Sequence, residues 1–353
     1  MIKISKSSHS VDSVWSEKFQ QGLKDLLERQ DLGFFQIPDR SELWSSTLDC
    51  AQALLADFDD FVFVGIGGSG LGGRTVANAL SGSPSLHFLE NVDQHSVDRV
   101  FGAIDPEKTA FVVTSKSGGT LETLALTNAI EEKLKSQSLT LKGRSVVITE
   151  PKSNPLSNWG ERFGARRLEI PVDVGGRFSV LSPVGLLPAA LLGASLGDLK
   201  AGALWAKENA HLSVELAALI QQSFERGEWV TQFWVYSDRF ATFGDWLQQL
   251  WAESLGKKVD RNGSPAPRVS TPMACVGAND QHSILQQVAE GERDKFLLFF
   301  RIAGQKDQLV PNLFPELKHL DSNGLQSVLD AEGNATLQAL SQAGVSYAEL
   351  ELE

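Results

Sequence analysis

Two glycine-rich turns constrain the fold of this chain more than any other feature of its sequence. The first, Gly-Ile-Gly-Gly-Ser-Gly at 65–70, follows an apolar run at 61–64. The second, Thr-Ser-Lys-Ser-Gly-Gly-Thr at 114–120, follows an apolar run at 110–113. Each run has the length and composition of a buried strand, and a helical stretch comes after each turn. The pattern predicts consecutive strand–turn–helix units, with small residues and free backbone N–H groups at each helix start.

The same alternation of short apolar runs and longer helical stretches continues through most of the chain. It predicts an α/β fold with two subdomains, each a mainly parallel sheet flanked by helices. The expected strands of the first subdomain cover 61–64, 86–89, 110–114, 145–149 and 168–172, with helices over 71–80, 97–103 and 121–137. Those of the second cover 232–236, 269–271, 296–301 and 346–352, with helices over 245–255, 281–290 and 324–343.

We expect three regions along the chain. We expect residues 1–50 to form a helical lead-in before the first subdomain, because residues 17–30 carry a mixed helical pattern. Residues 51–205 are expected to form the first α/β subdomain, which contains both glycine-rich turns, and residues 206–353 the second. No low-complexity linker separates the two subdomains in the sequence, so we expect them to pack tightly.

Composition and charge exclude several classes of protein. Apolar residues make up 42% and charged residues 22% of the chain, as in an ordinary folded protein. The net charge of −12 argues against a general nucleic-acid binder. The chain has two cysteines, Cys50 and Cys275, too few for a disulfide framework, which favours reduced thiols and a cytoplasmic location. The six histidines lack metal-binding spacing, so no metal site is expected.

One segment raises the question of a membrane span. Residues 178–197 carry no charge and are long enough to cross a bilayer. The segment also contains prolines, glycines and serines, so we expect a buried loop and helix in a large core instead. The first ten residues lack the apolar region of a secretory signal. The sequence therefore predicts no membrane association.

The first glycine-rich turn supports two interpretations. It matches the Gly-x-Gly-x-x-Gly fingerprint of dinucleotide-binding enzymes, and Glu90 lies twenty residues beyond Gly70, where such enzymes hold a ribose. Taken alone, this turn favours an NAD-dependent oxidoreductase. The second turn favours a sugar phosphate over a dinucleotide. Its hydroxyls and its lysine suit a phosphate group, and a dinucleotide site requires no such cluster after the neighbouring strand. These groups belong to Ser115, Lys116, Ser117 and Thr120.

Together, the two turns predict a single sugar phosphate held from two sides. For the second turn, the alternative is a serine-rich loop with an ordinary helix cap and no ligand. For the first turn, the alternative is a tight connection between a strand and a helix.

Six segments, in consistent order, resemble the glucose-6-phosphate isomerase family. They read Gly-Ile-Gly-Gly-Ser at 65–69, Asn-Val-Asp at 91–93, Ser-Lys-Ser-Gly-Gly-Thr-Leu-Glu-Thr at 115–123, Gly-Gly-Arg-Phe-Ser at 175–179, Glu-Ser-Leu-Gly-Lys at 253–257 and Gln-His-Ser at 281–283. Each match is short, but their shared order makes the resemblance specific. The family's fold has two sugar-isomerase-type (SIS-like) α/β subdomains, which agrees with the predicted strands and helices.

The resemblance implies an enzyme that interconverts glucose 6-phosphate and fructose 6-phosphate through a cis-enediol, without a redox cofactor or a metal. It gives Glu253 the role of the base that moves a proton between C2 and C1, and Arg177 that of stabilising the enediolate. Gln249, one helical turn before Glu253, would bind a substrate hydroxyl. The phosphate would be held through the two turns, by Gly68, Ser69, Ser115, Lys116, Ser117 and Thr120.

The resemblance also gives His282 the role of opening the sugar ring. In the family this histidine comes from the partner subunit, so we expect a homodimer with shared active sites. From the sequence, His282 is expected in the first turn of a helix, where the helix dipole favours a neutral imidazole. Without the resemblance, simpler explanations stand: Glu253 paired with Lys257, Arg177 in a structural ion pair, and His282 bonded to the backbone.

The chain departs from the family pattern at its C-terminus. The family continues into a helical segment whose lysine assists ring opening, whereas this sequence ends at Glu353 and its last lysine is Lys318. Three interpretations follow: a truncated form, ring opening by another group, or a non-catalytic sugar-phosphate-binding protein. We expect truncation, because the ending coincides with the junction to that segment.

Overall fold

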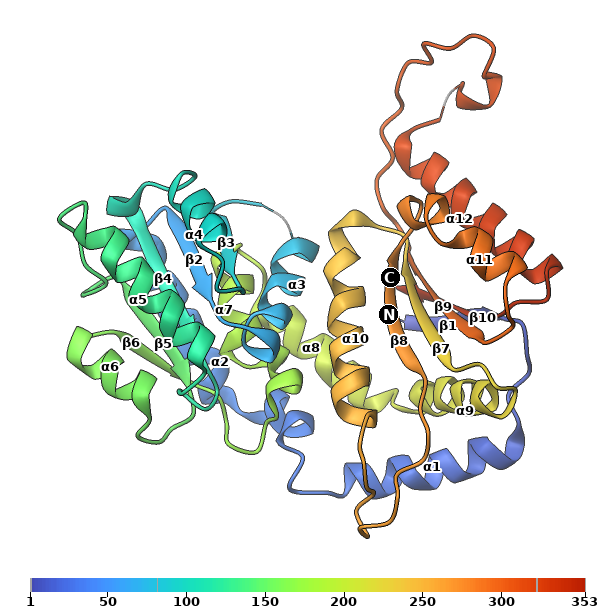
Figure 1. Cartoon of the computed structure of the whole chain (residues 1–353), viewed down its shortest axis with the longest axis horizontal. Helices are drawn as coiled ribbons and strands as arrows, with labels where there is room; N and C mark the ends of the chain where they lie inside the picture. Colours follow the sequence, from blue (N-terminus) through green and yellow to red (C-terminus); the bar gives the residue numbers. More distant parts are fainter. Residues whose placement is uncertain (1, 81, 322, 353) are drawn as a thin grey trace. The chain divides into compact units, whose positions relative to one another are not determined.

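The protein is described by a computed structural model that covers residues 2–80, 82–321 and 323–352. The chain forms two compact units: one is Arg29–Glu208, and the other joins the chain before this stretch to the chain after it. Each unit contains a five-stranded, mainly parallel sheet with helices on both faces, which confirms the predicted fold class (Figure 1). The expected lead-in of residues 1–50 is therefore divided between the two units.

The sheet of the unit Arg29–Glu208 is fully parallel, with the order β3-β2-β4-β5-β6. Its strands are β2 (Asp60–Val64), β3 (Ser85–Leu89), β4 (Thr109–Thr114), β5 (Ser145–Thr149) and β6 (Arg166–Glu169). The three central strands are buried along almost their whole length, which accounts for their continuous apolar runs. β3 lies on one side of β2, whereas β4, β5 and β6 lie on the other side, so the strand order switches direction between β2 and β4. The turns that follow these two strands therefore meet at the carboxyl edge of the sheet, where α/β proteins bind ligands.

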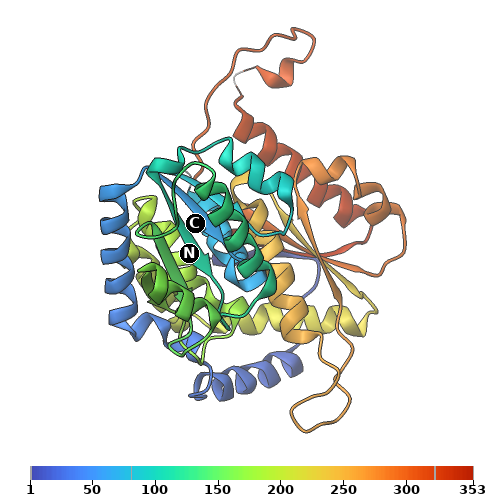
Figure 2. The same ribbon diagram turned by 60° about the vertical axis from the view of Figure 1, so that its left-hand side comes forward.

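Helices cover both faces of this sheet (Figure 2). One face carries α2 (Ser41–Asp57), α3 (Leu71–Leu80) and α7 (Pro183–Leu191), and the other carries α4 (Gln94–Phe101), α5 (Leu121–Lys135) and α6 (Pro155–Phe163). The last helix of the unit is α8 (Leu196–Glu208). All nine residues of α7 are buried, so the uncharged segment forms a core helix as expected. Within the part of the chain that the structure describes, no helix is long and apolar enough to cross a membrane.

The sheet of the second unit has the order β1-β10-β9-β7-β8. Its strands are β1 (Ile2–Ser7), β7 (Val230–Val235), β8 (Thr271–Val276), β9 (Lys295–Ile302) and β10 (Ser346–Leu352). β1 runs antiparallel to β10, and the other pairs are parallel. The strand predicted at 269–271 lies too early in the chain. The sequence pattern missed most of β8, because Pro272 lies inside this strand. This proline is tolerated because β8 lies at the edge of the sheet.

Helices on the two faces of this sheet bury its apolar side chains. One face carries α9 (His211–Glu225) and α10 (Ala241–Leu255), and α1 (Ser13–Leu27) packs on α9. The other face carries α11 (Leu285–Glu290) and α12 (Leu325–Gln342), over a core rich in aromatic rings such as Trp234, Tyr236 and Phe299.

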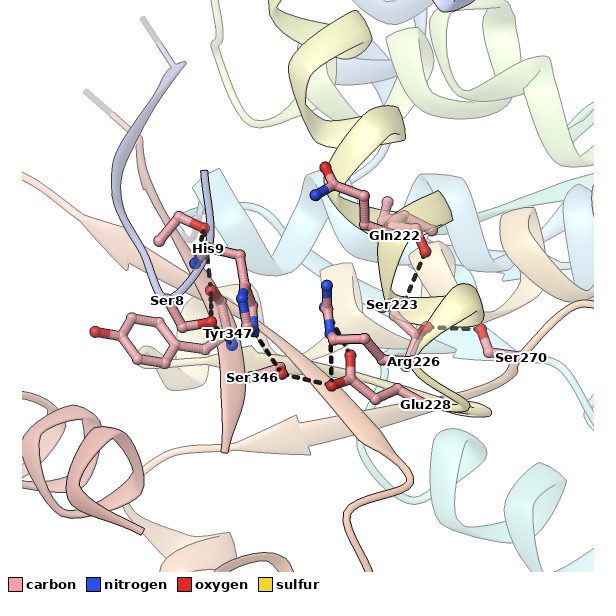
Figure 3. Close-up of polar contacts among 12 residues, drawn as sticks. Ser8, His9, Gln222, Ser223, Arg226, Glu228, Ser270, Ser346 and Tyr347 are labelled. Carbon is pink, nitrogen blue, oxygen red and sulfur yellow. Dashed lines mark hydrogen bonds and ion pairs between the residues drawn. The ribbon is translucent and has the colours of Figure 1, made fainter. Parts of the chain in front are cut away.

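A polar network fixes the segment after β1 to the start of β10 (Figure 3). Ser346 donates its hydroxyl proton to the Glu228 carboxylate, which also accepts hydrogen bonds from Arg226 at 2.9 and 3.0 Å. Because this proton is used, His9 Nε2 must donate to Ser346 Oγ, which lies 3.0 Å away. Burial, with a smaller effect of Arg226, lowers the pKa of His9. The network therefore links three separate segments through one carboxylate.

We expect Glu228→Gln to lower the free energy of unfolding by about 1–3 kcal/mol, because it removes a buried charge that both Arg226 and Ser346 bind. Arg226 remains 28% exposed, so water can partly replace its lost partner. Urea unfolding measures the effect. Glu215→Gln, an exposed change on α9, is the matched control and should leave stability unchanged. Equal stabilities of the two variants would show that the network contributes nothing.

Candidate active site

The turn at 114–120 connects β4 to α5 and is held by internal hydrogen bonds. Ser115 is fully buried; its Oγ lies 2.8 Å from Thr120 Oγ1 and accepts a hydrogen bond from Gly118 N at 3.1 Å. Gly118 has a φ of +70°, and a Cβ added there would lie 1.8 Å from Asn154 Oδ1. The conformation of the turn thus requires a glycine at this position.

The start of α5 is left open by this arrangement. Thr120 occupies the N-cap position, but its side chain does not cap the helix and bonds to Ser115 instead. Asp12, Asn154 and Ser182 each cap their own helices, whereas α2, α9, α10, α11 and α12 lack a side-chain cap, as α5 does. The first N–H groups of an α-helix have no partners within the helix, so those of α5 are directed at the carboxyl edge of the sheet. The arrangement suits an anion and argues against the ordinary helix cap considered above.

The polar side chains of this turn differ in what they can reach. Ser117 is exposed and Thr120 is half-buried, so both can contact a ligand, whereas the buried Ser115 shapes the turn. The ammonium of Lys116 lies 3.3 Å from Glu150 Oε1 and donates to the carbonyl oxygen of Val172 at 3.4 Å. Lys116 is thus already engaged by two acceptors.

Glu150 is a site residue that the sequence analysis missed. Its side chain is 9% exposed and pairs with both Lys116 and Lys152. The hydrogen bond with Lys152, together with the interaction with Lys116, lowers the pKa of this carboxyl. A signal was available, because a glutamate directly after a buried parallel strand must lie at the same edge as the glycine-rich turns.

The first glycine-rich turn packs closely against the segment that carries Arg177. A Cβ at Gly68 would lie 2.4 Å from the carbonyl carbon of Gly176, and Ser179 Oγ donates to the carbonyl oxygen of Gly68 at 3.0 Å. Gly68 and Ser69 both lie in the 3-10 turn Gly67–Ser69, and Ser69 is half-buried. Gly68 is therefore needed for the contact between two backbones.

Contacts within the unit account for the residues of the dinucleotide fingerprint. Its second glycine, Gly67, has a φ of +57°, and a Cβ at its third glycine, Gly70, would lie 2.4 Å from the carbonyl oxygen of Gly65 and 2.7 Å from Glu90 Oε1. Glu90, the expected partner of a ribose, instead pairs with Arg74 of α3 at 3.0 Å. The glycines and the acid of the fingerprint are thus explained by packing within the unit.

Arg177 lies on a well-anchored segment. It belongs to the 3-10 helix Gly176–Leu181, is half-buried, and its guanidinium lies 4.4 Å from the centre of the Phe178 ring. Just before it, Asp173 accepts two hydrogen bonds from Arg40, one of them at 2.9 Å, which lower the pKa of this carboxyl. The backbone N–H of Gly33 also donates to the carbonyl oxygen of Asp173 at 3.1 Å. These contacts hold Arg177 at the edge of the sheet.

In the second unit, α10 carries Gln249 and Glu253. Glu253 is exposed and lies in the last turn of the helix, as expected. Gln249 Nε2 donates to Glu253 Oε1 at 2.8 Å, while its buried Oε1 has no hydrogen-bond partner among the residues that the structure describes. The amide thus orients one carboxylate oxygen, while its own oxygen is a buried acceptor that no described hydrogen bond uses.

His282 does not lie in the first turn of an α-helix, and the prediction for this element was wrong. The residue ends the 3-10 helix Asn279–His282, and α11 begins only at Leu285. Asp280 anchors this 3-10 helix, because its carboxylate accepts hydrogen bonds from Val276 N at 2.7 Å and Ser283 Oγ at 2.8 Å. The effect of a helix dipole on His282, which was expected from the sequence, therefore has no structural basis. The imidazole of His282 is exposed.

The predicted site residues fall into two groups. Gly68, Ser69, Arg177 and the turn at 114–120 gather in the unit Arg29–Glu208, and Gln249, Glu253 and His282 lie in the other unit. No group of His, Cys, Asp or Glu side chains suited to a metal ion occurs among the described residues.

The parallel sheets and the open helix start define the class of protein: an α/β fold of the phosphosugar-isomerase type. A solved structure of a hypothetical protein from Thermus thermophilus superimposes with a TM-score of 0.82 and 33% identity, over 97% of this chain and 88% of that one. Residues 50–312 match the family described as "Phosphoglucose isomerase".

Two named relatives support the same assignment. The glucose-6-phosphate isomerase of Thermus thermophilus is 39% identical over 322 residues, which cover 89% of this chain and 77% of that protein. The glucose-6-phosphate isomerase of Carboxydothermus hydrogenoformans is 34% identical over 361 residues, covering 93% and 77%. The chain belongs to the phosphoglucose isomerase family, as its six segments predicted.

Proposed function

We propose that this protein is a glucose-6-phosphate isomerase that interconverts D-glucose 6-phosphate and D-fructose 6-phosphate. Membership of the family supports this activity. The observation that carries the proposal is the uncapped start of α5 beside Thr120, because a phosphate ester needs a group of unpaired donors at a fixed position. No NAD is required, since the chemistry moves a proton within one molecule.

In this proposal, the phosphate binds at the start of α5. Ser117, Thr120 and the backbone N–H groups of the first helical turn donate to its oxygens, and Ser115 maintains the shape of the turn. Gly68 and Ser69 approach from the turn after β2. Each hydrogen bond to a charged group contributes about 1.5–3 kcal/mol, so a few of them suffice to hold a small phosphate ester.

The proposed reaction moves one proton between two carbons and one between their oxygens. Glu253 removes the proton from C2 of the open-chain aldose, which leaves a cis-enediolate with its negative charge on the C1 oxygen. Glu253 then returns the proton to C1, the proton of the C2 hydroxyl passes to the C1 oxygen, and C2 becomes the carbonyl carbon. C2 is oxidised as C1 is reduced, so no external oxidant takes part. Arg177 stabilises the negative oxygen of the intermediate, and Gln249 orients Glu253 and binds a hydroxyl.

Ring opening is assigned to His282. We propose that the histidine acts in a homodimer, where the partner subunit supplies it to the site. This assignment follows from the family resemblance, and the exposure of His282 on its short 3-10 turn is consistent with it. A cytoplasmic location belongs to the same proposal, since the buried cysteines Cys50 and Cys275 are free thiols.

The direct test is proton exchange at C1 of fructose 6-phosphate in D₂O, followed by NMR without added cofactor or metal. We expect loss of the C1 proton signal together with the appearance of glucose 6-phosphate. Tight binding of the sugar phosphate without exchange would identify a binding protein on the same scaffold. Exchange that depends on NAD would restore the oxidoreductase interpretation.

A further inference from the structure

We propose that the Lys116 side chain is a positioning residue, held by Glu150, and is not a phosphate ligand. It ties the phosphate-binding turn to the segment that leads to Arg177. The inference rests on the proposed function for its kinetic consequences, while its structural basis lies entirely within the unit Arg29–Glu208.

The backbone of Lys116 is first attached to the end of β5. Its carbonyl oxygen accepts hydrogen bonds from Glu150 N at 3.1 Å and from Thr149 Oγ1 at 3.2 Å. Arg167 Nη2 donates to the carbonyl oxygen of Glu150 at 3.1 Å, which fixes Glu150 from the neighbouring strand. The backbone of Lys116 is therefore firmly attached to the end of β5.

The ammonium of Lys116 is then held between two acceptors on different segments. One is Glu150 Oε1 at 3.3 Å, and the other is the carbonyl oxygen of Val172 at 3.4 Å. The Lys116 side chain is 26% exposed and the Glu150 side chain 9% exposed. To reach a phosphate, Lys116 would have to leave a buried carboxylate whose other partner among the described residues is the more exposed Lys152.

The phosphate has other donors available. The uncapped start of α5 and the hydroxyls of Ser117 and Thr120 supply hydrogen bonds without breaking an existing ion pair. Moving Lys116 would add one charge-assisted contact and disrupt two. The balance therefore favours Lys116 staying where it is when a phosphate binds.

The contact with Val172 gives Lys116 its effect on catalysis. Val172 directly precedes Asp173, which Arg40 clamps, and the chain then passes through two glycines to Arg177. The link from Lys116 to Val172 thus sets the distance between the bound phosphate and the Arg177 guanidinium. Because small misplacements of catalytic groups are costly, we expect its loss to affect kcat more than phosphate binding.

A double-mutant cycle tests the proposal with Lys116→Met, Glu150→Gln and the double variant. Each single change should lower kcat about tenfold and change the inhibition constant of inorganic phosphate less than about threefold. The double variant should be no worse than Lys116→Met, because Glu150 acts on the link to Val172 only through the Lys116 ammonium. Lys116→Arg keeps N–H donors for both Glu150 and the carbonyl oxygen of Val172, so it should recover most of the activity.

Lys152→Met is the matched control, since Lys152 binds the same carboxylate but makes no contact with Val172 in the described structure. It should leave kcat within about twofold of the unchanged protein. A rise of about tenfold or more in the phosphate inhibition constant for Lys116→Met, without one for Glu150→Gln, would make Lys116 a phosphate ligand and overturn the proposal. Additive losses in the double variant would also overturn it.

A readout that does not depend on activity separates this proposal from the proposed function. Amide hydrogen exchange over residues 172–177 should be faster, and by similar factors, in Lys116→Met and Glu150→Gln than in Lys152→Met. An unchanged exchange rate in both variants would contradict the link even in an active enzyme. An inactive unchanged protein with accelerated exchange in both variants would contradict only the proposed function.

Discussion

Glu253→Gln is expected to slow proton exchange at C1 of fructose 6-phosphate by about 10²–10⁴-fold, the usual contribution of a positioned general base. The change removes the basic oxygen but keeps the size of the side chain. Gln249 can still hydrogen-bond to the remaining carbonyl oxygen, so the end of α10 should keep its conformation. NMR in D₂O measures the exchange, and the inhibition constant of inorganic phosphate should stay unchanged, because the proposed phosphate site lies in the other unit.

Glu290→Gln provides a matched control for this experiment. Glu290 ends α11, is exposed, and accepts a hydrogen bond from Gln286 one turn earlier, which repeats the local arrangement of Gln249 and Glu253. The control should exchange at the rate of the unchanged protein. Exchange that persists in Glu253→Gln would show that another group is the base.

Gly118→Ala is expected to destabilise the protein by about 2–4 kcal/mol and to abolish phosphate binding. A side chain at a φ of +70° costs about 1–2 kcal/mol. The new Cβ would also displace Asn154, whose Oδ1 lies 1.8 Å from the Cβ position. Asn154 forms the capping box of α6 with Ser157, and the loss of a helix cap costs about 0.5–2 kcal/mol. Urea unfolding and phosphate inhibition of the isomerase measure the two effects.

The neighbouring Gly119 is the matched control. A Cβ at Gly119 would meet no heavy atom within 4 Å, and its φ lies outside the left-handed region. Gly119→Ala should therefore leave the stability within about 0.5 kcal/mol of the unchanged protein. If both variants were equally stable, the conformation described for the turn would be wrong.

The regular elements could be predicted where their local pattern is strong. The helix expected at 71–80 coincides with α3, and the strand expected at 145–149 coincides with β5. β1 was missed, because its sequence of alternating Ile, Lys and Ser is short and mostly polar. Its stability comes from pairing with β10 at the other end of the chain, and no local pattern reports such a distant contact.

The order of the motifs along the chain was enough to predict the family, the fold class and the residue types that a phosphate and a proton transfer require. Their individual positions depend on contacts between segments far apart in the sequence. Ser115 is buried and hydrogen-bonds within the turn, and the nearly buried Glu150 pairs with Lys116. Gly68 is required because the backbone of Gly176 packs on it from more than one hundred residues away. Local sequence carries propensity and spacing, whereas burial and close packing arise only when distant segments meet.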